Sequence, residues 1–210
     1  MLIVKILVIT TFITFILLAS IDASIFDSRW YEKQFTKNNI YQTLDAKRVT
    51  DQTENLFSYL KNENSLDSQY YTNREVTHLT DIKNIINILQ ITTFISLAGL
   101  VSGLLLIYQR EKKAALIKIL SIAAVTAIVF YTSLGLLITY NFDQFFSILH
   151  QLSFRNDFWL LDPTTENLIN IFPPNLFAAL GSTIIAKAIL ASLITLILAR
   201  LWLLKSNKKG

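Results

Sequence analysis

The sequence predicts an all-α integral membrane protein in which four transmembrane helices carry a helical extracytoplasmic cap. Hydrophobic residues make up 52% of the 210-residue chain, and the mean hydropathy of +0.45 exceeds what one soluble core normally requires. Four apolar segments also approach the length of roughly 18 to 25 residues that a helix needs to cross a membrane. We predict spans at residues 1–20, 85–109, 114–140 and 176–204.

The first span, residues 1–20, resembles a secretory signal because Lys5 precedes an apolar run that small residues follow. A cleaved signal and a retained anchor both fit this pattern, and we favour the anchor. In the second span, Gly99 and Gly103 have the spacing that lets membrane helices approach closely.

Residues 21–84 form the predicted cap. They contain no proline or glycine and carry recurring aromatic residues, which is unlike a linker. Val49, Leu56 and Leu60 recur at roughly helical spacing. The run from Thr72 to Glu75 has the pattern of a capping box, which predicts a helix that opens there and continues into the second span.

Basic residues set the predicted orientation in the cell membrane. They occur in the short loop 110–113 and in the tail 205–210, as Arg110, Lys112, Lys113, Lys205, Lys208 and Lys209. The positive-inside rule makes these two segments cytoplasmic and leaves residues 21–84 and 141–175 on the outer side. Much of the excess basic charge therefore lies at the ends of spans, so we expect membrane lipid as a partner and no nucleic acid.

Residues 141–175 form the second outer segment. Apolar residues three or four apart at 142–152 predict an interfacial helix at the membrane surface, with His150 within it. Asp162 and Pro163 then have the pattern of a helix cap followed by the first helical residue. We predict a short helix from there to Ile171.

The only two histidines of the chain both lie in the outer segments, next to predicted spans. Glu75, His78 and Asp81 follow at spacings of three, so they lie close to one helix face. A histidine beside a membrane span often serves packing alone. Because both histidines are on the same side and near carboxylates, acid–base chemistry is an equally good interpretation. Asp157 has no evident local role and is a candidate to orient a histidine ring such as that of His150.

Other chemistries find little support in the sequence. Cysteine is absent, which excludes disulfides, thiolate metal sites and a cysteine acyl-enzyme. There is no HExxH motif, no glycine-rich phosphate loop and no Gly-x-Ser-x-Gly elbow. We therefore expect no metal and no cofactor. Imidazole chemistry on a lipid-borne group remains.

Two spaced motifs carry a resemblance to a known family. They read Glu75-x-x-His78-Leu79-x-Asp81-Ile82-Lys83 in the first outer segment, and Leu149-His150, Asn156-Asp157-x-Trp159-x-x-Asp162-Pro163 and Leu168-Ile169-x-x-Phe172-Pro173 in the second. In these motifs, and in length, span number and loop order, the chain resembles the lipoprotein intramolecular transacylase (Lit) family of Gram-positive bacteria.

The resemblance implies an acyl transfer within one substrate, a diacylglyceryl lipoprotein. The fatty acid on its sn-2 oxygen would move to the α-amino group of its N-terminal cysteine and leave a lyso-form lipoprotein. We expect His78 and His150 to be catalytic, with His78 slightly favoured as the base, although the two roles are exchangeable. The expected orienting or supporting residues are Glu75, Asp81, Asp157 and Asp162, and the expected pocket residues are Asn156 and Trp159.

Purely structural roles compete with the functional roles of several of these residues. Asp162 is favoured as a simple cap, and Trp159 as an aromatic residue of the membrane interface. Two other functions stay open for the chain as a whole. One is a non-enzymatic membrane protein that binds a lipoprotein or peptide through its cap, and the other is a hydrolase that releases the fatty acid to water. We expect a monomer in each case.

Overall fold

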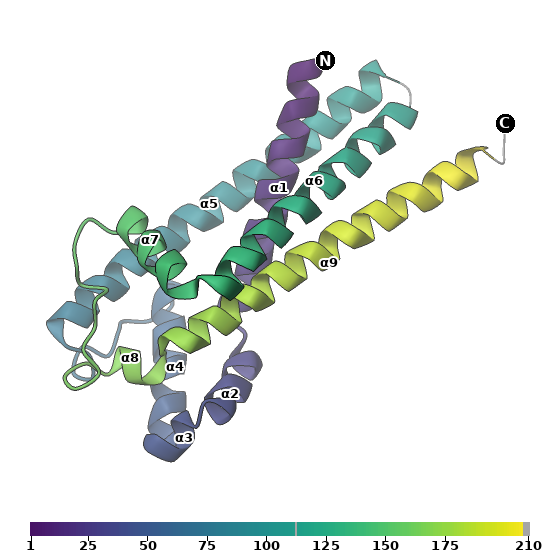
Figure 1. The fold of residues 1–210 in the computed structure, drawn as a ribbon. Helices are drawn as coiled ribbons and strands as arrows, with labels where there is room; N and C mark the ends of the chain where they lie inside the picture. The colour runs from purple at the N-terminus through teal and green to yellow at the C-terminus, as the bar shows by residue number, and fades with distance from the viewer. Residues whose placement is uncertain (112, 208–210) are drawn as a thin grey trace. The chain divides into compact units, whose positions relative to one another are not determined.

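The computed structural model describes residues 1–111 and 113–207. Lys112, Lys208 and Lys209, which contributed to the predicted orientation, lie outside these residues. The described residues form nine α-helices and no strand, which confirms the all-α fold (Figure 1). Four of the helices in this part of the chain are long and apolar enough to cross a membrane.

The chain divides into two compact units. Unit 1 consists of Met1–Asp22, Leu89–Leu137 and Ser182–Gly210, and unit 2 consists of Ala23–Ile88 and Ile138–Gly181.

Unit 1 is built from the apolar parts of the four long helices. These helices are α1 (Leu2–Ile25), α5 (Asn73–Arg110), α6 (Lys113–Tyr140) and α9 (Pro174–Asn207). The 38 residues of α5 measure about 57 Å at 1.5 Å per residue, nearly twice the roughly 30 Å of membrane hydrocarbon. The polar turns of α5 before Ile85 therefore extend beyond the membrane-spanning part.

Within unit 1, α1 and α5 approach closely at the two glycines of α5. A Cβ atom on Gly103 would lie 2.5 Å from Cγ2 of Val8, and one on Gly99 would lie 3.0 Å from Cγ2 of Thr11. The expected role of these glycines in helix packing is confirmed. The Tyr131 hydroxyl of α6 also donates a hydrogen bond of 2.5 Å to a backbone carbonyl of α1.

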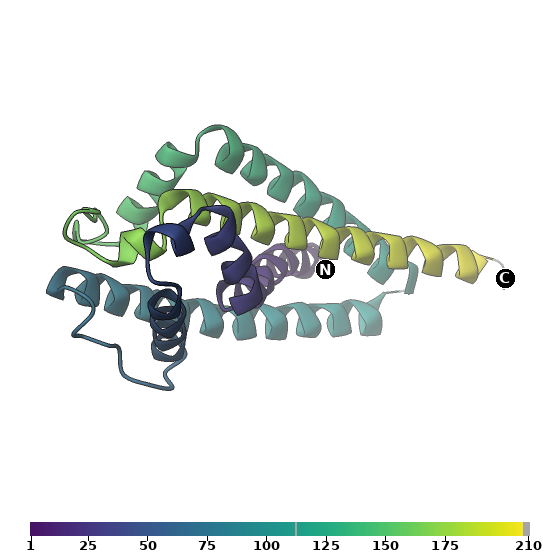
Figure 2. The same cartoon turned by 90° about the horizontal axis from the view of Figure 1, so that it is seen from below.

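Unit 2 holds the five shorter helices. These are α2 (Ser28–Lys37), α3 (Ile40–Thr43), α4 (Ala46–Leu60), α7 (Phe142–Ser153) and α8 (Leu168–Ile171). The carboxylates of Asp27 and Asp45 accept hydrogen bonds from the first turns of α2 and α4, where they satisfy free N–H groups. In both Figure 1 and Figure 2, α2 and α3 lie beside α4.

The core of unit 2 is an aromatic cluster. Tyr31 and Phe35 of α2 contact Phe172 edge-on, with ring centroids 5.9 and 5.8 Å away, and Phe57 of α4 lies 5.0 Å from Tyr31. Such edge-to-face contacts add to the burial of large apolar rings. The cluster therefore links the helices before α5 to the segment that follows α8.

The capping box at the start of α5 is confirmed. The Glu75 carboxylate accepts a hydrogen bond from the backbone N–H of Thr72 at 2.7 Å, and the Thr72 hydroxyl accepts one from the Glu75 N–H at 3.3 Å. The two groups therefore satisfy each other's free donors.

The helix predicted from Pro163 to Ile171 is much shorter in the structure. Only Leu168–Ile171 are helical, and a turn replaces the expected first part. The Asp162 carboxylate accepts hydrogen bonds from the N–H and the hydroxyl of Thr164, at 2.8 and 2.7 Å. Asp162 is thus a capping residue, but it caps a turn, because its side chain bonds the chain two residues ahead.

Candidate functional site

Unit 2 brings the two histidines of the chain together. His78 lies on the second turn of α5, and His150 lies near the end of α7. Their ring centroids are 6.2 Å apart, and their planes are inclined by 31°. Both rings can therefore contact one small group placed between or beside them.

Aromatic rings surround His150. The rings of Phe146, Trp159 and Phe154 lie 4.0, 4.9 and 5.5 Å from its ring, measured between centroids. Phe146 belongs to the same helix one turn earlier, whereas Trp159 comes from the loop after α7. Apolar rings exclude water here, so burial lowers the pKa of His150, while a hydrogen bond to the backbone of Phe146 opposes that effect.

That hydrogen bond also fixes the tautomer of His150. Its Nδ1 lies 2.7 Å from the carbonyl oxygen of Phe146. Because a carbonyl can only accept, Nδ1 must carry a proton and donate it. In the neutral ring Nε2 is then an acceptor, which is the state that a general base requires.

His78 is more deeply buried. Only 4% of its surface is exposed, and the ring of Phe154 packs on it at 4.8 Å. Burial, reinforced by the neighbouring His150, lowers the pKa of His78 to about 4, and the nearby Asp81 opposes this shift. At neutral pH the ring is therefore uncharged. Its Nδ1 atom is buried and has no hydrogen-bond partner among the described residues.

Asp81 lies one turn after His78 on α5 and holds the segment 141–175. Its carboxylate accepts a hydrogen bond of 2.9 Å from the side-chain amide of Asn156. The Asn156 side-chain oxygen in turn accepts from the backbone N–H of Phe158, at 3.1 Å. Asp81 and Asn156 thus fix the loop that carries Trp159.

Asp157 does not take the place expected for it. Its side chain is exposed, and Nδ1 of His150 bonds the carbonyl oxygen of Phe146 instead. The backbone carbonyl of Asp157 is the group in use, because it accepts a hydrogen bond of 2.6 Å from the Arg74 guanidinium. The carboxylate of Asp157 is therefore not the group that sets the tautomer of His150 in this structure.

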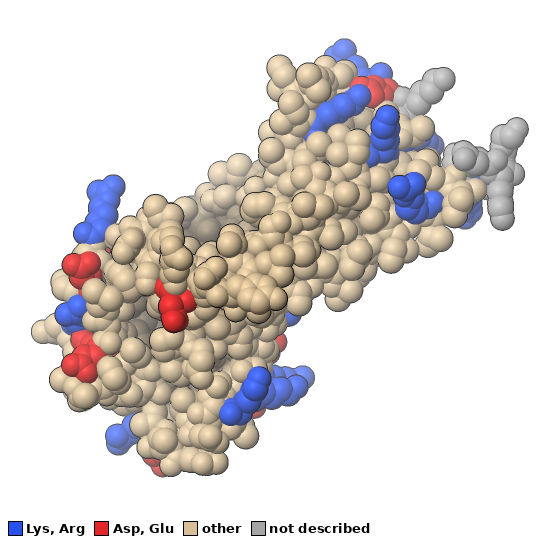
Figure 3. Space-filling model, in the orientation of Figure 1, with Lys and Arg blue, Asp and Glu red and all other residues tan. Residues whose placement is uncertain are grey.

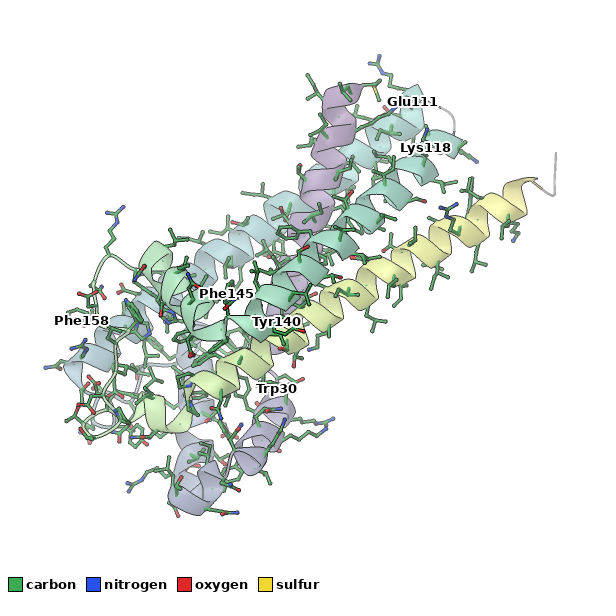
Figure 4. The ribbon with its side chains drawn as sticks, viewed as in Figure 1. Trp30, Glu111, Lys118, Tyr140, Phe145 and Phe158 are labelled. Carbon is green, nitrogen blue, oxygen red and sulfur yellow. The ribbon has the colours of Figure 1, made fainter. Side chains whose placement is uncertain are left out.

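Arg74 is a site residue that the sequence did not single out. Besides the Asp157 carbonyl, its guanidinium contacts the Glu166 carboxylate at 3.7 Å and lies 5.7 Å from the centre of the Phe158 ring. Figure 4 labels Phe158 on the loop that follows α7. One arginine thus contacts this loop at three points. The proximity of Arg74 to Glu75 in the sequence was the only available signal.

Glu75 is completely buried and contacts two segments that lie far apart in the sequence. One carboxylate oxygen takes part in the capping box, and the other accepts a hydrogen bond of 2.5 Å from the backbone N–H of Leu168, at the start of α8. The side-chain amide of Asn167 donates to the carbonyl oxygen of Tyr70 beside it, at 2.6 Å. Glu75 therefore supports the site by joining α5 to α8.

The structure therefore sorts the expected site residues into three groups. His78, His150 and Trp159 meet in one aromatic cluster. Glu75, Asp81 and Asn156 hold the segments that carry these rings. The third group consists of Asp157 and Asp162, whose side chains lie at the surface of the loop. Sequence reasoning missed Phe146 and Phe154 because phenylalanine next to a membrane usually indicates only apolar contact.

The fold of the chain is that of solved membrane proteins from Bacillus cereus. The in meso structure of the membrane integral lipoprotein intramolecular transacylase Lit superposes with a TM-score of 0.85 at 21% identity, covering 99% of this chain and 97% of that one. A variant with a histidine-to-arginine substitution gives a TM-score of 0.83 at 20% identity, covering 99% and 94% of the two chains. The corresponding histidine-to-alanine variant gives 0.82 at 20% identity, covering 99% and 95%.

No curated protein sequence matches the chain. The four apolar helices and the membrane-integral relatives make it a multi-pass membrane protein. The family model described as "Lipoprotein intramolecular transacylase Lit" matches residues 6–177, which include both histidines and the segments 21–84 and 141–175. The chain belongs to the lipoprotein intramolecular transacylase family.

Proposed function

We propose that this chain moves the sn-2 acyl group of a diacylglyceryl lipoprotein to the α-amino group of the lipoprotein's N-terminal cysteine. The observation that carries this proposal is the meeting of His78 and His150, in a chain of this family, inside an aromatic cluster. Amine and ester belong to one substrate molecule, so the enzyme needs only to hold them together in a dry site. No nucleophile from the protein is required.

His150 is the stronger candidate for the general base. Its Nδ1–H is committed to the Phe146 carbonyl, which leaves Nε2 as the basic nitrogen and stabilises the charge that the ring gains. The sequence slightly favoured His78 for this role. The pKa of His78, about 4, favours His150 over His78 as the base, because a ring that resists protonation is a poor proton acceptor.

In the proposed reaction, the neutral amine attacks the ester carbon and forms the new C–N bond. One amine proton passes to Nε2 of His150. The tetrahedral intermediate then breaks its C–O bond to glycerol, and His150 returns the proton to the departing glyceryl oxygen. The products are an amide and a free sn-2 hydroxyl, and no water is consumed.

His78 would act as a neutral hydrogen-bond donor. An uncharged imidazole can donate from Nε2 to the oxyanion of the tetrahedral intermediate, where a buried donor stabilises developing charge strongly. The burial of His78 and the lack of a partner for its Nδ1 among the described atoms fit a ring that keeps its one proton on Nε2.

The site is proposed to lie on the extracytoplasmic face, at the depth of the lipid glycerol groups. The helix α7 leaves Ile148, Leu149 and Leu152 exposed by 46, 47 and 83%, and such an apolar face suits a helix lying in the membrane surface. The sn-2 ester of a membrane-anchored lipoprotein occurs at the same depth.

The test is expression in a bacterium whose lipoproteins carry diacylglyceryl cysteine with a free amine, followed by tandem mass spectrometry of their N-terminal lipopeptides. We expect one acyl chain to move from glycerol to nitrogen at unchanged total mass. Alanine at both His78 and His150 should abolish the shift, because each acid–base group contributes about 10²- to 10⁴-fold in rate. The Asp162→Asn variant keeps a side-chain oxygen that can accept the hydrogen bond from Thr164, so it should preserve the acyl shift.

Two outcomes would select another function. Free fatty acid in place of the N-acyl product would identify a hydrolase. Unchanged lipopeptides despite confirmed membrane expression would favour a protein that only binds its lipoprotein.

A further inference from the structure

Unit 1 has a groove between α6 and α9 at the end where its basic residues gather. The groove has a volume of about 510 Å³ and is lined mainly by apolar side chains, including Ile122, Val125 and Leu203. Its charged lining residues are Lys118 of α6 and Arg200 of α9. Figure 3 shows lysine and arginine side chains gathered at this end, and Figure 4 labels Lys118 there.

Among the described residues, no carboxylate neutralises the two cations of the groove. Neither Lys118 nor Arg200 forms an ion pair with any residue that the structure describes, although both are exposed. The carboxylate of Glu111, which lies at this end, pairs instead with Lys5 at 2.8 Å. Because unpaired charges beside hydrocarbon are costly, the two cations favour an anion from outside the protein.

A hydroxyl in the groove is also unused. The Ser121 Oγ atom, one turn after Lys118, is buried and has no hydrogen-bond partner among the described residues. By contrast, the hydroxyls of Ser96 and Ser192 donate to the carbonyl four residues earlier in their helices, at 2.7 and 2.8 Å. Because Ser121 lines the groove, its hydroxyl is a candidate donor to a group bound there.

We propose that this groove binds one anionic phospholipid of the surrounding membrane. Its phosphate lies between Lys118 and Arg200, where Arg200 can form two parallel hydrogen bonds to it. One acyl chain follows Ile122, Val125 and Leu203. A free phosphate would leave this apolar wall uncovered, so the groove fits a lipid better than a soluble anion. By the positive-inside rule, the lipid belongs to the cytoplasmic leaflet.

The full-length protein, purified in a nonionic detergent, provides the test. Thermal unfolding is followed with added phosphatidylglycerol or with phosphatidylcholine of the same acyl chains, and native mass spectrometry counts the bound lipids. We expect phosphatidylglycerol to raise Tm more than phosphatidylcholine does, with one molecule retained. The Lys118→Gln/Arg200→Gln variant should bind it at least tenfold more weakly.

A matched variant controls for net charge. Arg110→Gln/Lys205→Gln removes one arginine and one lysine at the same end of unit 1 but outside the groove lining. It should keep the response to phosphatidylglycerol. Equal Tm shifts with the two lipids in the wild-type protein would overturn the proposal even if the groove variant does not fold. An equal loss in both variants, or the same shift with inorganic phosphate, would also overturn it.

Discussion

The carboxylate of Glu75 accepts a hydrogen bond of 2.5 Å from the backbone N–H of Leu168, 93 positions further along the chain. The same side chain completes the capping box of α5. One buried carboxylate therefore fixes the start of the helix that carries His78 and the end of the segment that carries His150.

Replacing Glu75 tests this link. In the Glu75→Gln variant an amide N–H₂ replaces one of the two carboxylate oxygens. The backbone N–H of either Thr72 or Leu168 then loses its buried acceptor. We expect a loss of about 1–3 kcal/mol in stability, together with reduced acyl transfer, because α5 and α8 are no longer held together. Tm in detergent and the lipopeptide assay measure the two effects. Glu63→Gln, at an exposed position after α4, is the control and should change neither. An equal response of the two variants would refute the supporting role.

The buried His78 predicts how stability depends on pH. Its pKa is about 4 in the folded chain and 6.5 when unperturbed, so between these values the unfolded chain binds a proton that the folded chain does not. The stability that the neutral ring contributes is complete above about pH 6.5 and is lost as the pH falls toward 4. We expect Tm to fall less between pH 7 and pH 5 in His78→Gln than in the wild-type protein. Parallel curves for the two proteins would count against a buried neutral ring.

The substrate should govern the pH dependence of catalysis above neutrality. Both histidines have lowered pKa values, so both rings are already neutral at pH 7. An α-amino group titrates near pH 7.7–8.0, and only its neutral form attacks the ester. We expect kcat/KM for acyl transfer to rise between about pH 6.5 and 8.5 as the amine loses its proton. A rise that was complete by pH 6.5 would show that the amine is not the titrating group.

Asp81 and Asn156 allow a charge-swap test. The Asp81→Asn variant places two amides opposite each other, and the Asn156→Asp variant places two carboxylates there. Each single variant should therefore lower both Tm and activity. The double variant restores one donor and one acceptor at the same positions. We expect it to recover most of the Tm and part of the acyl transfer. Additive losses in the double variant would show that the 2.9 Å contact does not hold the loop.

The close approach of α1 and α5 predicts a steric effect at Gly103. A Cβ atom there would lie 2.5 Å from Cγ2 of Val8, so Gly103→Ala should lower Tm. Adding Val8→Ala removes the obstructing methyl group and should give a more stable protein than Gly103→Ala alone. Gly181→Ala is the control, because its Cβ would meet Ile138 at an ordinary 3.5 Å. If Gly103→Ala and Gly181→Ala behave alike, the helices do not depend on this contact.

The sequence by itself determined the features that depend on neighbouring residues. The apolar runs indicated four long helices, and Val49, Leu56 and Leu60 indicated the buried face of α4, because both patterns need only local spacing. The capping box at Thr72 and Glu75 was readable for the same reason. The short helix after Asp162 was predicted to begin too early because local signals cannot distinguish a turn cap from a helix cap.

Only the tertiary structure decided which groups meet at the site. The Phe146 carbonyl that sets the tautomer of His150, and the Asp157 carbonyl that Arg74 holds, are backbone groups that every residue possesses, so the sequence carries no sign of them. The distance between the rings of His78 and His150 likewise depends on contacts such as that of Glu75 with Leu168. Spacing along the chain fixes which residues share a helix face, whereas long-range packing fixes which faces come together.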